Sequence, residues 1–244
     1  MEKTTNIGKY IALLAAFALV IGCLAMAGCA DSGSAGSKGS TSNSTASSSH
    51  GTSSVGNTAS SSDAGDMTVT NKAILTIKGY DPVTIDLYGE EAPLTVANFV
   101  GLAESGYYDG LALYRIQDGF VIQGGTKGDN ASGSDPSLSA IEGEFSENGH
   151  ENALADNFDT GVVAMARTNV PDSATSTFFI TLGPASKVGP SLDGKYAAFG
   201  TIDAEGMAII EEVVNDYKEY AGGNMGAISD SSHMPVIESI VITE

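Results

Sequence analysis

Arg115 is the residue of this sequence whose type and neighbours best fit a catalytic role. It lies near the start of the segment 113–125, LYRIQDGFVIQGG, in which Phe120 and Gln123 follow it. An arginine carries a planar, permanently charged guanidinium with several N–H donors, so it can donate hydrogen bonds to a bound group. Taken alone, an arginine is most often a surface charge and a phenylalanine is most often a core residue. A functional interpretation therefore needs support from the rest of the chain.

Three more segments supply that support. They are APLTVANF at residues 92–99, GVVAMARTNVPDSATSTFFI at residues 161–180 and LDGKYAAFG at residues 192–200. In this order and spacing the segments resemble the cyclophilin family, especially its bacterial members, and the resemblance extends over nearly all of residues 68–244. It implies a mainly β fold, namely a closed eight-stranded antiparallel β-barrel capped by two α-helices, and peptidyl-prolyl cis-trans isomerase (rotamase) activity.

The chemistry that the resemblance implies is rotation about an X–Pro peptide bond. This rotation is slow because the amide has partial double-bond character. A catalyst can stabilise the twisted state, in which the proline nitrogen has become pyramidal and basic. It needs a fixed hydrogen-bond donor near that nitrogen and an apolar pocket for the ring, and it needs no nucleophile, metal or cofactor. Arg115 is the candidate donor.

Matching the family's motifs residue by residue gives a candidate site. The residues expected to act in catalysis, as donor, as its support or as walls of the proline pocket, are Arg115, Phe120, Gln123, Phe179, Leu192 and Tyr196. The residues expected to bind the rest of the substrate are Val121, Ala166, Arg167 and Thr177. Outside this constellation, Phe120, Phe179 and Leu192 would be read as ordinary core residues.

The sequence departs from the family's pattern at several of these positions. Val121 stands where the family often has Met, and Tyr196 stands where many members have His. Thr177 replaces a Gln of many members, which shortens one substrate contact, and Arg167 replaces an Asn of many eukaryotic members. Ser191 occupies the position of a Trp that helps to bind the inhibitor cyclosporin. These departures affect inhibitor binding more than catalysis.

The elements that must position these residues can be predicted from periodicity. Aliphatic residues alternate along 83–88, which indicates a strand with one buried face, and the turn 78–82 joins it to a strand at 73–77. A helix is expected from Pro93 to Gly106, and a second helix at about 205–218. Further strands are expected at 111–116, 120–123, 161–167, 176–182, 196–202 and 236–243.

The N-terminus has the layout of an export signal. Lys3 and Lys9 precede an apolar run that extends from about residue 10 to residue 27. The run ends at Cys29, in a sequence that resembles the lipobox of bacterial lipoproteins, so we expect residues 1–28 to be a signal peptide and Cys29 to carry lipid such as palmitate. An earlier match ends at Cys23, but the apolar run continues past it. An uncleaved transmembrane helix with two incidental cysteines is the alternative.

Residues 29–66 are expected to form a disordered tether that joins this anchor to one folded domain, residues 67–244. After Cys29 the segment is almost entirely Ser, Gly, Thr, Ala and Asn, which cannot bury enough apolar surface to fold. We therefore expect a monomeric enzyme that is anchored by lipid to the outer face of the cell membrane. Its expected partners are unfolded or extended, proline-containing exported polypeptides.

Composition excludes several other kinds of partner. The chain has 30 acidic and 11 basic residues and a formal net charge of -19, so nucleic acid is not an expected partner. His50, His150 and His233 lie far apart in the sequence and form no metal-ligand pair. The polar stretch 128–135 lacks the ligand spacing of a calcium-binding EF-hand. No metal site and no cofactor are expected.

Two other functional classes remain as alternatives to an enzyme. A binding module could use the same groove to hold extended polypeptide without turnover, but the presence of Arg115 favours catalysis. A solute-binding lipoprotein would need a larger, two-lobed domain, and the barrel motifs argue against it.

Overall fold

The computed structural model describes residues 67–127, 135–223 and 225–244. These residues form ten strands and three α-helices, together with three short 3-10 helices. In chain order the strands and α-helices are β1 (Asn71–Ile77), β2 (Val83–Leu87), α1 (Pro93–Glu104), β3 (Arg115–Gln117), β4 (Val121–Gly124), β5 (Val162–Met165), β6 (Phe178–Thr181), α2 (Ala185–Leu192), β7 (Ala198–Ile202), α3 (Ala204–Tyr217), β8 (Ala221–Gly222), β9 (Ala227–Ile228) and β10 (Ile237–Thr243). The 3-10 helices are Ser146–Asn148, Lys218–Tyr220 and Ser231–His233.

The first two strands form the antiparallel hairpin that the alternating pattern predicts. In β2, Val83, Ile85 and Leu87 are buried while the residues between them are half-buried. The turn closes with a hydrogen bond of 3.0 Å from the Tyr80 amide to the Ile77 carbonyl. Alternation predicts this element well because one face of the hairpin packs on the core and the other is solvated.

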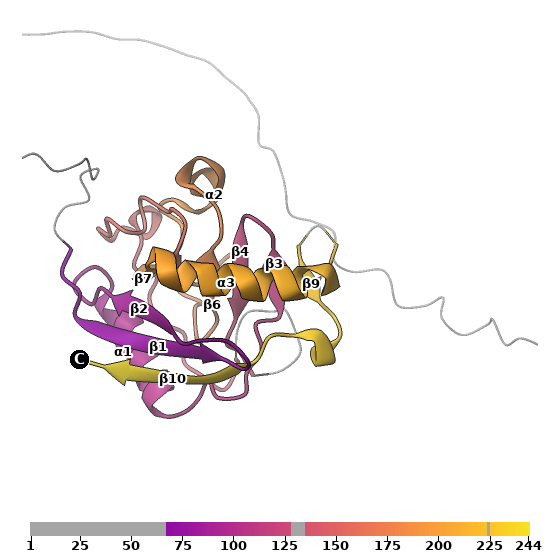
Figure 1. Ribbon diagram of the computed structural model, residues 1–244. Coiled ribbons are helices and arrows are strands. Elements are labelled where there is room, and N and C mark those ends of the chain that lie inside the picture. The colour runs from indigo at the N-terminus through magenta and orange to yellow at the C-terminus, as the bar shows by residue number, and fades with distance from the viewer. Residues whose placement is uncertain (1–66, 128–134, 224) are drawn as a thin grey trace, which may run out of the picture. The chain divides into compact units, whose positions relative to one another are not determined.

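All ten strands belong to one antiparallel sheet. Their order is β10-β1-β2-β7-β5-β6-β4-β3-β9-β8. The C-terminal strand β10 pairs with β1 from Lys72 to Ile77, so the two ends of the domain lie side by side (Figure 1). The central strands β4, β5, β6 and β7 come from the segments that carry the family resemblance.

The sheet curls, and the segment before β3 returns to the start of β10. Ala112 forms an isolated bridge with Val236, and the Leu113 amide donates to the Pro235 carbonyl at 2.9 Å. The expected closed eight-stranded barrel is thus confirmed only as a mainly β, curled antiparallel sheet, which has ten strands. The two unexpected strands, β8 and β9, form a two-residue ladder in a segment without apolar alternation.

Three α-helices are present where two were expected. The predicted helices correspond to α1 and α3, and Figure 1 shows α3 crossing in front of the strands while α1 lies behind β1 and β2. The additional helix α2 contains Gly189 and Pro190, which disfavour a helix in a sequence-based reading. Its buried residues Val188 and Leu192 anchor it to the outer face of the sheet, and this packing outweighs the weak local propensity.

The central strands are buried on both faces, so the domain has two apolar cores. The inner core includes a cluster of aromatic rings in which Phe99 of α1 lies 4.9 Å from Phe199 and 5.7 Å from Phe178, between ring centroids. The outer core packs Phe179 of β6 against Phe158 and Leu192. Because neighbouring residues of a strand point to opposite faces, Phe178 and Phe179 serve different cores. The candidate site residues Phe179 and Leu192 belong to the outer core.

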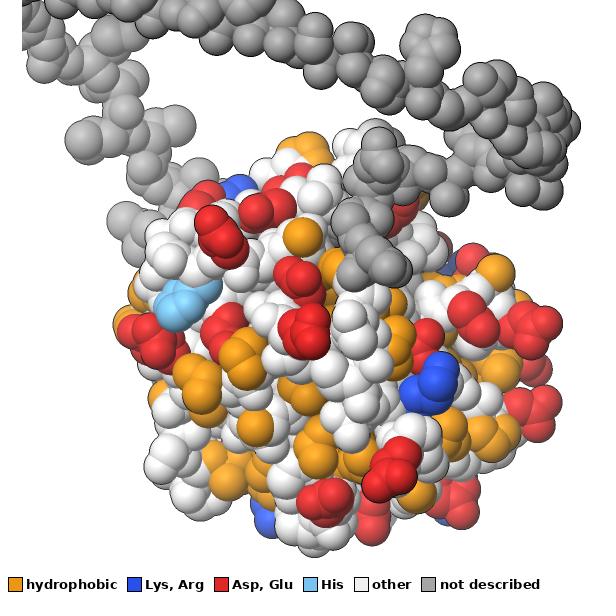
Figure 2. All heavy atoms as spheres, turned by 90° about the vertical axis from the view of Figure 1, so that its left-hand side faces the viewer, with side chains coloured by type: hydrophobic (Ala, Val, Ile, Leu, Met, Phe, Trp, Pro, Cys, Tyr) orange, Lys and Arg blue, Asp and Glu red, His pale blue; other side chains and the backbone are white. Residues whose placement is uncertain are grey.

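The predicted signal peptide, the lipidated Cys29 and the tether all lie outside the described residues, as does most of the stretch 128–135. Within residues 67–127, 135–223 and 225–244, no helix is long and apolar enough to cross a membrane. Figure 2 shows one face of the domain, on which acidic side chains far outnumber basic ones. The acidic composition therefore appears on the surface of the folded part.

Candidate active site

Strand register brings the three central candidates into one row. Arg115 of β3 is paired with Gln123 of β4, Gln123 with Phe179 of β6, and Phe179 with Ala164 of β5. Residues that lie directly opposite each other on neighbouring strands project from the same face of a sheet. The guanidinium, the amide and the phenyl ring are therefore adjacent, although up to 64 residues separate them in the sequence.

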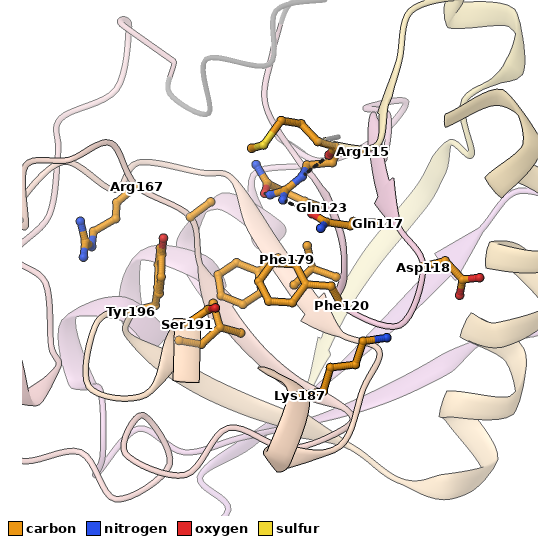
Figure 3. A pocket seen from close by; sticks show the side chains of 14 residues that line it. Arg115, Gln117, Asp118, Phe120, Gln123, Arg167, Phe179, Lys187, Ser191 and Tyr196 are labelled. Carbon is orange, nitrogen blue, oxygen red and sulfur yellow. Dashed lines mark hydrogen bonds between the residues drawn. The ribbon is translucent and has the colours of Figure 1, made fainter. Parts of the chain in front are cut away.

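These side chains line a cavity of about 630 Å³ on the outer face of the sheet (Figure 3). Nine of the ten predicted site residues line it, and Thr177 is the exception. The described lining residues are Arg115, Gln117, Asp118, Phe120, Val121, Gln123, Ala166, Arg167, Phe179, Lys187, Ser191, Leu192, Tyr196 and Met225.

Arg115 is held in one orientation by three hydrogen bonds. Its Nε donates to the Met225 carbonyl oxygen at 2.7 Å, Nη1 donates to Gln123 Oε1 at 2.7 Å, and Nη2 donates to Gln117 Oε1 at 2.8 Å. All three acceptors are uncharged. Burial lowers the pKa of the guanidinium, but an arginine remains charged throughout the physiological range. The site thus contains an oriented positive charge that no carboxylate among these partners neutralises.

Gln123 is fixed at both ends of its amide group. Its Oε1 accepts from Arg115, and its Nε2 donates to the Tyr114 hydroxyl at 2.9 Å. Tyr114 is buried, and this burial raises the pKa of its phenol, so the hydroxyl is neutral at physiological pH. Tyr114 therefore supports Arg115 indirectly, through Gln123, and it was not among the predicted site residues. Tyr114 directly precedes Arg115 in the sequence and belongs to the inner core. A buried tyrosine is an ordinary core residue, so the sequence does not indicate that its hydroxyl contacts Gln123.

An apolar pocket lies beside the guanidinium. Val121, Phe179 and Leu192 form its buried walls, with exposed fractions of 2%, 3% and 4%. Phe120 and Tyr196 are half-buried at its edge, and the Tyr196 ring meets the Phe179 ring edge-on at 5.4 Å between centroids. An apolar ring of substrate can enter this pocket while a polar atom of the same group faces Arg115.

Arg167 closes one side of the cavity. Its Nε donates to the Lys195 carbonyl and its Nη1 to the Thr168 carbonyl, both at 2.8 Å. The guanidinium also lies over the rings of Tyr196 at 4.8 Å and Phe145 at 5.0 Å, distances at which cation–π attraction is effective. Ala166, the residue before it, is buried, and its amide donates to the Thr177 carbonyl.

Thr177 does not take the position that the sequence analysis expected. Its side chain is fully buried, its hydroxyl has no hydrogen-bond partner among the described residues, and it does not line the cavity. Thr177 lies immediately before β6, and its hydroxyl is buried away from the lining of the cavity. Its contribution is the backbone hydrogen bond to Ala166.

Sequence reasoning missed four lining residues, which differ in how they could have been found. Gln117 lies two residues after Arg115 on the same strand face, so alternation could have identified it. Lys187 lies four residues before Ser191 on α2, a spacing that places both on one helix face, but α2 itself was not expected. Met225 comes from beyond β8, 110 residues from Arg115. Asp118 is exposed in the β3–β4 turn.

The arrangement is suited to binding and polarising a group rather than to covalent chemistry. The described lining residues include no histidine and no cysteine, and their serine, Ser191, is exposed without a basic partner among them. What they offer is an oriented cation beside an apolar pocket.

A sequence model of the family described as "Cyclophilin type peptidyl-prolyl cis-trans isomerase/CLD" matches residues 72–231. The chain is similar to the peptidyl-prolyl cis-trans isomerase ppi1 of Schizosaccharomyces pombe, with 35% identity over 156 residues that cover 63% of this chain and 85% of the relative. It is also similar to a bacterial peptidyl-prolyl cis-trans isomerase of Acinetobacter baylyi, with 34% identity over 134 residues that cover 54% of this chain and 66% of the relative.

Among solved structures, the fold is similar to that of a cyclophilin-type peptidyl-prolyl cis-trans isomerase of Cryptosporidium parvum, which was determined in the presence of the dipeptide Ala-Pro. The TM-score is 0.54 at 24% sequence identity, and the match covers 71% of this chain and 99% of that one. A cyclophilin of Hirschia baltica matches with a TM-score of 0.51 at 22% identity, covering 72% of this chain and 74% of that one. These likenesses confirm the fold.

Proposed function

The chain belongs to the cyclophilin-type peptidyl-prolyl cis-trans isomerases, and on this premise we propose that it accelerates X–Pro rotation in exported polypeptides outside the cytoplasmic membrane. The isomerase activity follows from the family and from the relatives. The clients, the site residues and the place of action are our proposal.

The observation that carries the proposed site is the uncharged set of acceptors around Arg115. A guanidinium has five N–H donors, and three of them are engaged by Met225, Gln123 and Gln117. One N–H on each terminal nitrogen is left to meet a ligand. Because the acceptors are neutral, the full positive charge remains available in a partly desolvated site, where electrostatic stabilisation is strongest.

The proposed mechanism uses this charge on the twisted peptide bond. The proline ring occupies the pocket formed by Phe120, Val121, Phe179 and Leu192. As the bond rotates, conjugation is lost and the lone pair that was delocalised into the carbonyl becomes localised on the proline nitrogen. A free N–H of Arg115 donates to that nitrogen and stabilises the twisted state more than either planar state, which is the requirement for catalysis. No covalent bond forms or breaks.

A prolyl isomerase assay on residues 67–244 tests the activity and the donor together. We expect the wild-type domain to catalyse isomerisation equally well with and without a chelator, since the proposed mechanism uses no metal. Arg115→Ala should lose most of the activity, while Lys78→Ala, which changes an exposed lysine in the β1–β2 turn, should not. An inactive wild-type domain would contradict the proposed function, and loss of activity on chelation would contradict the cofactor-free mechanism.

The proposed location rests on the sequence of residues 1–66. A charged head, an apolar run, Cys29 at its end and a Ser- and Gly-rich tether are together typical of an exported lipoprotein. Protease added to intact cells, with the outer envelope made permeable where there is one, should digest the domain if it lies on the outer face of the cytoplasmic membrane. Digestion that occurs only after lysis of the cytoplasmic membrane would contradict this location.

A further inference from the structure

The charge of the cavity is opposite to that of the chain. Acidic residues outnumber basic ones by 30 to 11 in the sequence, yet the described lining residues include three basic side chains and one acidic side chain. The basic residues are Arg115, Arg167 and Lys187. The acidic residue, Asp118, already has a basic partner, because Lys218 Nζ lies 3.4 Å from its carboxylate.

None of the three basic side chains has a carboxylate partner within the described part of the chain. Arg115 and Arg167 donate only to amide and backbone oxygens. Lys187 takes part in none of the ion pairs found among the described residues. Lys78, Lys127 and Lys195 likewise take part in none of these ion pairs, so the lack of a carboxylate partner does not by itself set Lys187 apart. What distinguishes Lys187 from these three lysines is its position in the lining of the cavity.

Of these three cations, Lys187 is the one whose side chain forms no hydrogen bond or ion pair with the described residues. Arg115 is the proposed donor to the proline nitrogen. Arg167 joins the end of β5 to the loop at Lys195 and packs on two aromatic rings. Lys187 projects from α2 along the rim of the cavity near Phe120, on the side away from Arg167 (Figure 3). Its Nζ lies against the turn residue Gly119, where a Cβ would collide with it. Gly119 has a φ of +66°, so the backbone of this turn also favours glycine.

We propose that the site prefers proline segments that carry a carboxylate close to the proline, and that Lys187 determines this preference. The inference rests on the proposed isomerase function. The Lys187 ammonium stands beside the proline pocket without a carboxylate partner, so a Glu or Asp side chain near a bound proline can pair with it. Local pairing of this kind also offsets the repulsion that an acidic peptide meets from the rest of the surface.

Matched peptides test the preference directly. The peptides form four pairs, one for each of the two positions before and the two positions after the proline. The two members of a pair differ only in having Glu or Gln at that position. Exchange NMR with the full-length protein gives kcat/KM for each peptide. We expect the Glu peptide of at least one pair to be favoured about threefold to fivefold at low salt, as for a partly exposed ion pair. The preference should shrink in 0.5 M NaCl because salt screens such pairs.

Three variants assign the preference to a residue. Lys187→Gln should bring the Glu-to-Gln ratio close to one, while Lys78→Gln makes the same change of charge outside the site and should keep the wild-type ratio. A ratio of one or less in all four pairs would overturn the proposal. So would a preference that survives in Lys187→Gln, or one that disappears in Arg167→Gln but not in Lys187→Gln. If the wild type isomerises no peptide of any pair, the proposed function itself fails, whereas equal catalysis of both members of every pair removes only the acidic preference.

Discussion

The acceptors around Arg115 are two side-chain amides and one backbone carbonyl, so they orient the guanidinium without neutralising it. A carboxylate in any of these places would bind the guanidinium more strongly, since opposite charges attract each other in addition to forming the hydrogen bond. It would also cancel the charge that is needed at the proline nitrogen. The neutral acceptors thus hold the Arg115 guanidinium less strongly than a carboxylate would, but they leave its positive charge available to a substrate.

Replacing the donor tests this role. Arg115→Ala should lower kcat/KM by about 100-fold or more, the usual cost of removing one preorganised donor. Arg115→Lys should also be poor, because a lysine ammonium lacks the planar fork that meets Gln117 and Gln123 while presenting a further N–H to substrate. Circular dichroism spectra of both variants should match that of the wild type. Near-normal activity in Arg115→Ala would show that another group is the donor.

Gln117 offers a sharper test of the uncharged acceptors. Gln117→Glu keeps an acceptor for Arg115 Nη2 but makes it a carboxylate, so we expect kcat to fall about tenfold or more, which corresponds to about 1.4 kcal/mol or more. Gln117→Leu removes the acceptor and should lower kcat less, because Gln123 and Met225 still hold the guanidinium. If Gln117 served only to orient Arg115, the Glu variant would be at least as active as the wild type, and that result would refute the requirement for neutral acceptors.

At this scale the sequence identifies most of the cavity residues that occur within the matched segments, although Gln117 and Asp118 of segment 113–125 were missed. It also misses Lys187 and Met225, which lie outside those segments. Phe120, Gln123 and Phe179 were identified because they match the family's motifs, and the register of β3, β4 and β6 places Gln123 between Arg115 and Phe179. Met225 supports Arg115 through its backbone oxygen, which does not depend on side-chain type. No property of the sequence at position 225 reports that contact. Thr177 is the converse case, since its position matches a motif but its side chain is buried and does not line the cavity.

At the scale of elements, α1 depends on a residue that lies far away in the sequence. The helix has no capping side chain of its own at Ala92. Instead the buried carboxylate of Glu144 accepts hydrogen bonds from the Leu94 amide at 3.0 Å, the Thr95 amide at 2.8 Å and the Thr95 hydroxyl at 2.7 Å. A negative charge at a helix N-terminus also interacts favourably with the helix dipole. Glu144 therefore ties the loop before β5 to the helix that carries Phe99 into the inner core.

Removing this charge should destabilise the domain. Glu144→Gln keeps the size of the side chain but replaces an acceptor-only carboxylate by an amide, so we expect the free energy of unfolding to fall by about 1.5–3 kcal/mol, the range for hydrogen bonds to charged groups. Urea denaturation at pH 7 measures the change. Glu147→Gln, at an exposed position three residues later, serves as the control and should stay within about 0.5 kcal/mol of the wild type. Equal stability of the two variants would argue against the capping role of Glu144.

Elements were predictable where local pattern and tertiary packing agree. The β1–β2 hairpin, α1 and α3 show clear periodicity and were placed nearly to their observed ends. Helix α2 is stabilised by the outer core rather than by propensity, since Gly189 and Pro190 oppose it. The β8–β9 pair, two residues per strand, is too short for any pattern. The contact between the segment before β3 and the start of β10 is an isolated bridge between Ala112 and Val236, which lies outside all named strands.

At the scale of the whole molecule, an acidic domain is joined to a segment with the features of a lipoprotein leader. A formal net charge of -19 keeps such a chain soluble and repels it from anionic lipid surfaces. Stable residence at a membrane then needs an anchor, and a covalent lipid supplies one. A tethered isomerase would stay where exported chains emerge unfolded, and there a slow X–Pro bond can limit folding.

We propose that Cys29 carries the lipid, and replacement of each cysteine in turn tests this assignment. Cys29→Ser should move the protein from the membrane fraction to the soluble fraction or to an unprocessed precursor, because one residue carries the whole attachment. Cys23→Ser should leave it in the membrane fraction, since the apolar run continues past residue 23 and cleavage is expected before residue 29. Mass spectrometry of the mature N-terminus gives the direct measurement, with an acylated Cys29 as the expected first residue. A lipid on Cys23, or a mature chain that begins at Met1 without lipid, would overturn the assignment. The isomerase function would stand in either case, because every residue of the proposed site lies between Arg115 and Met225.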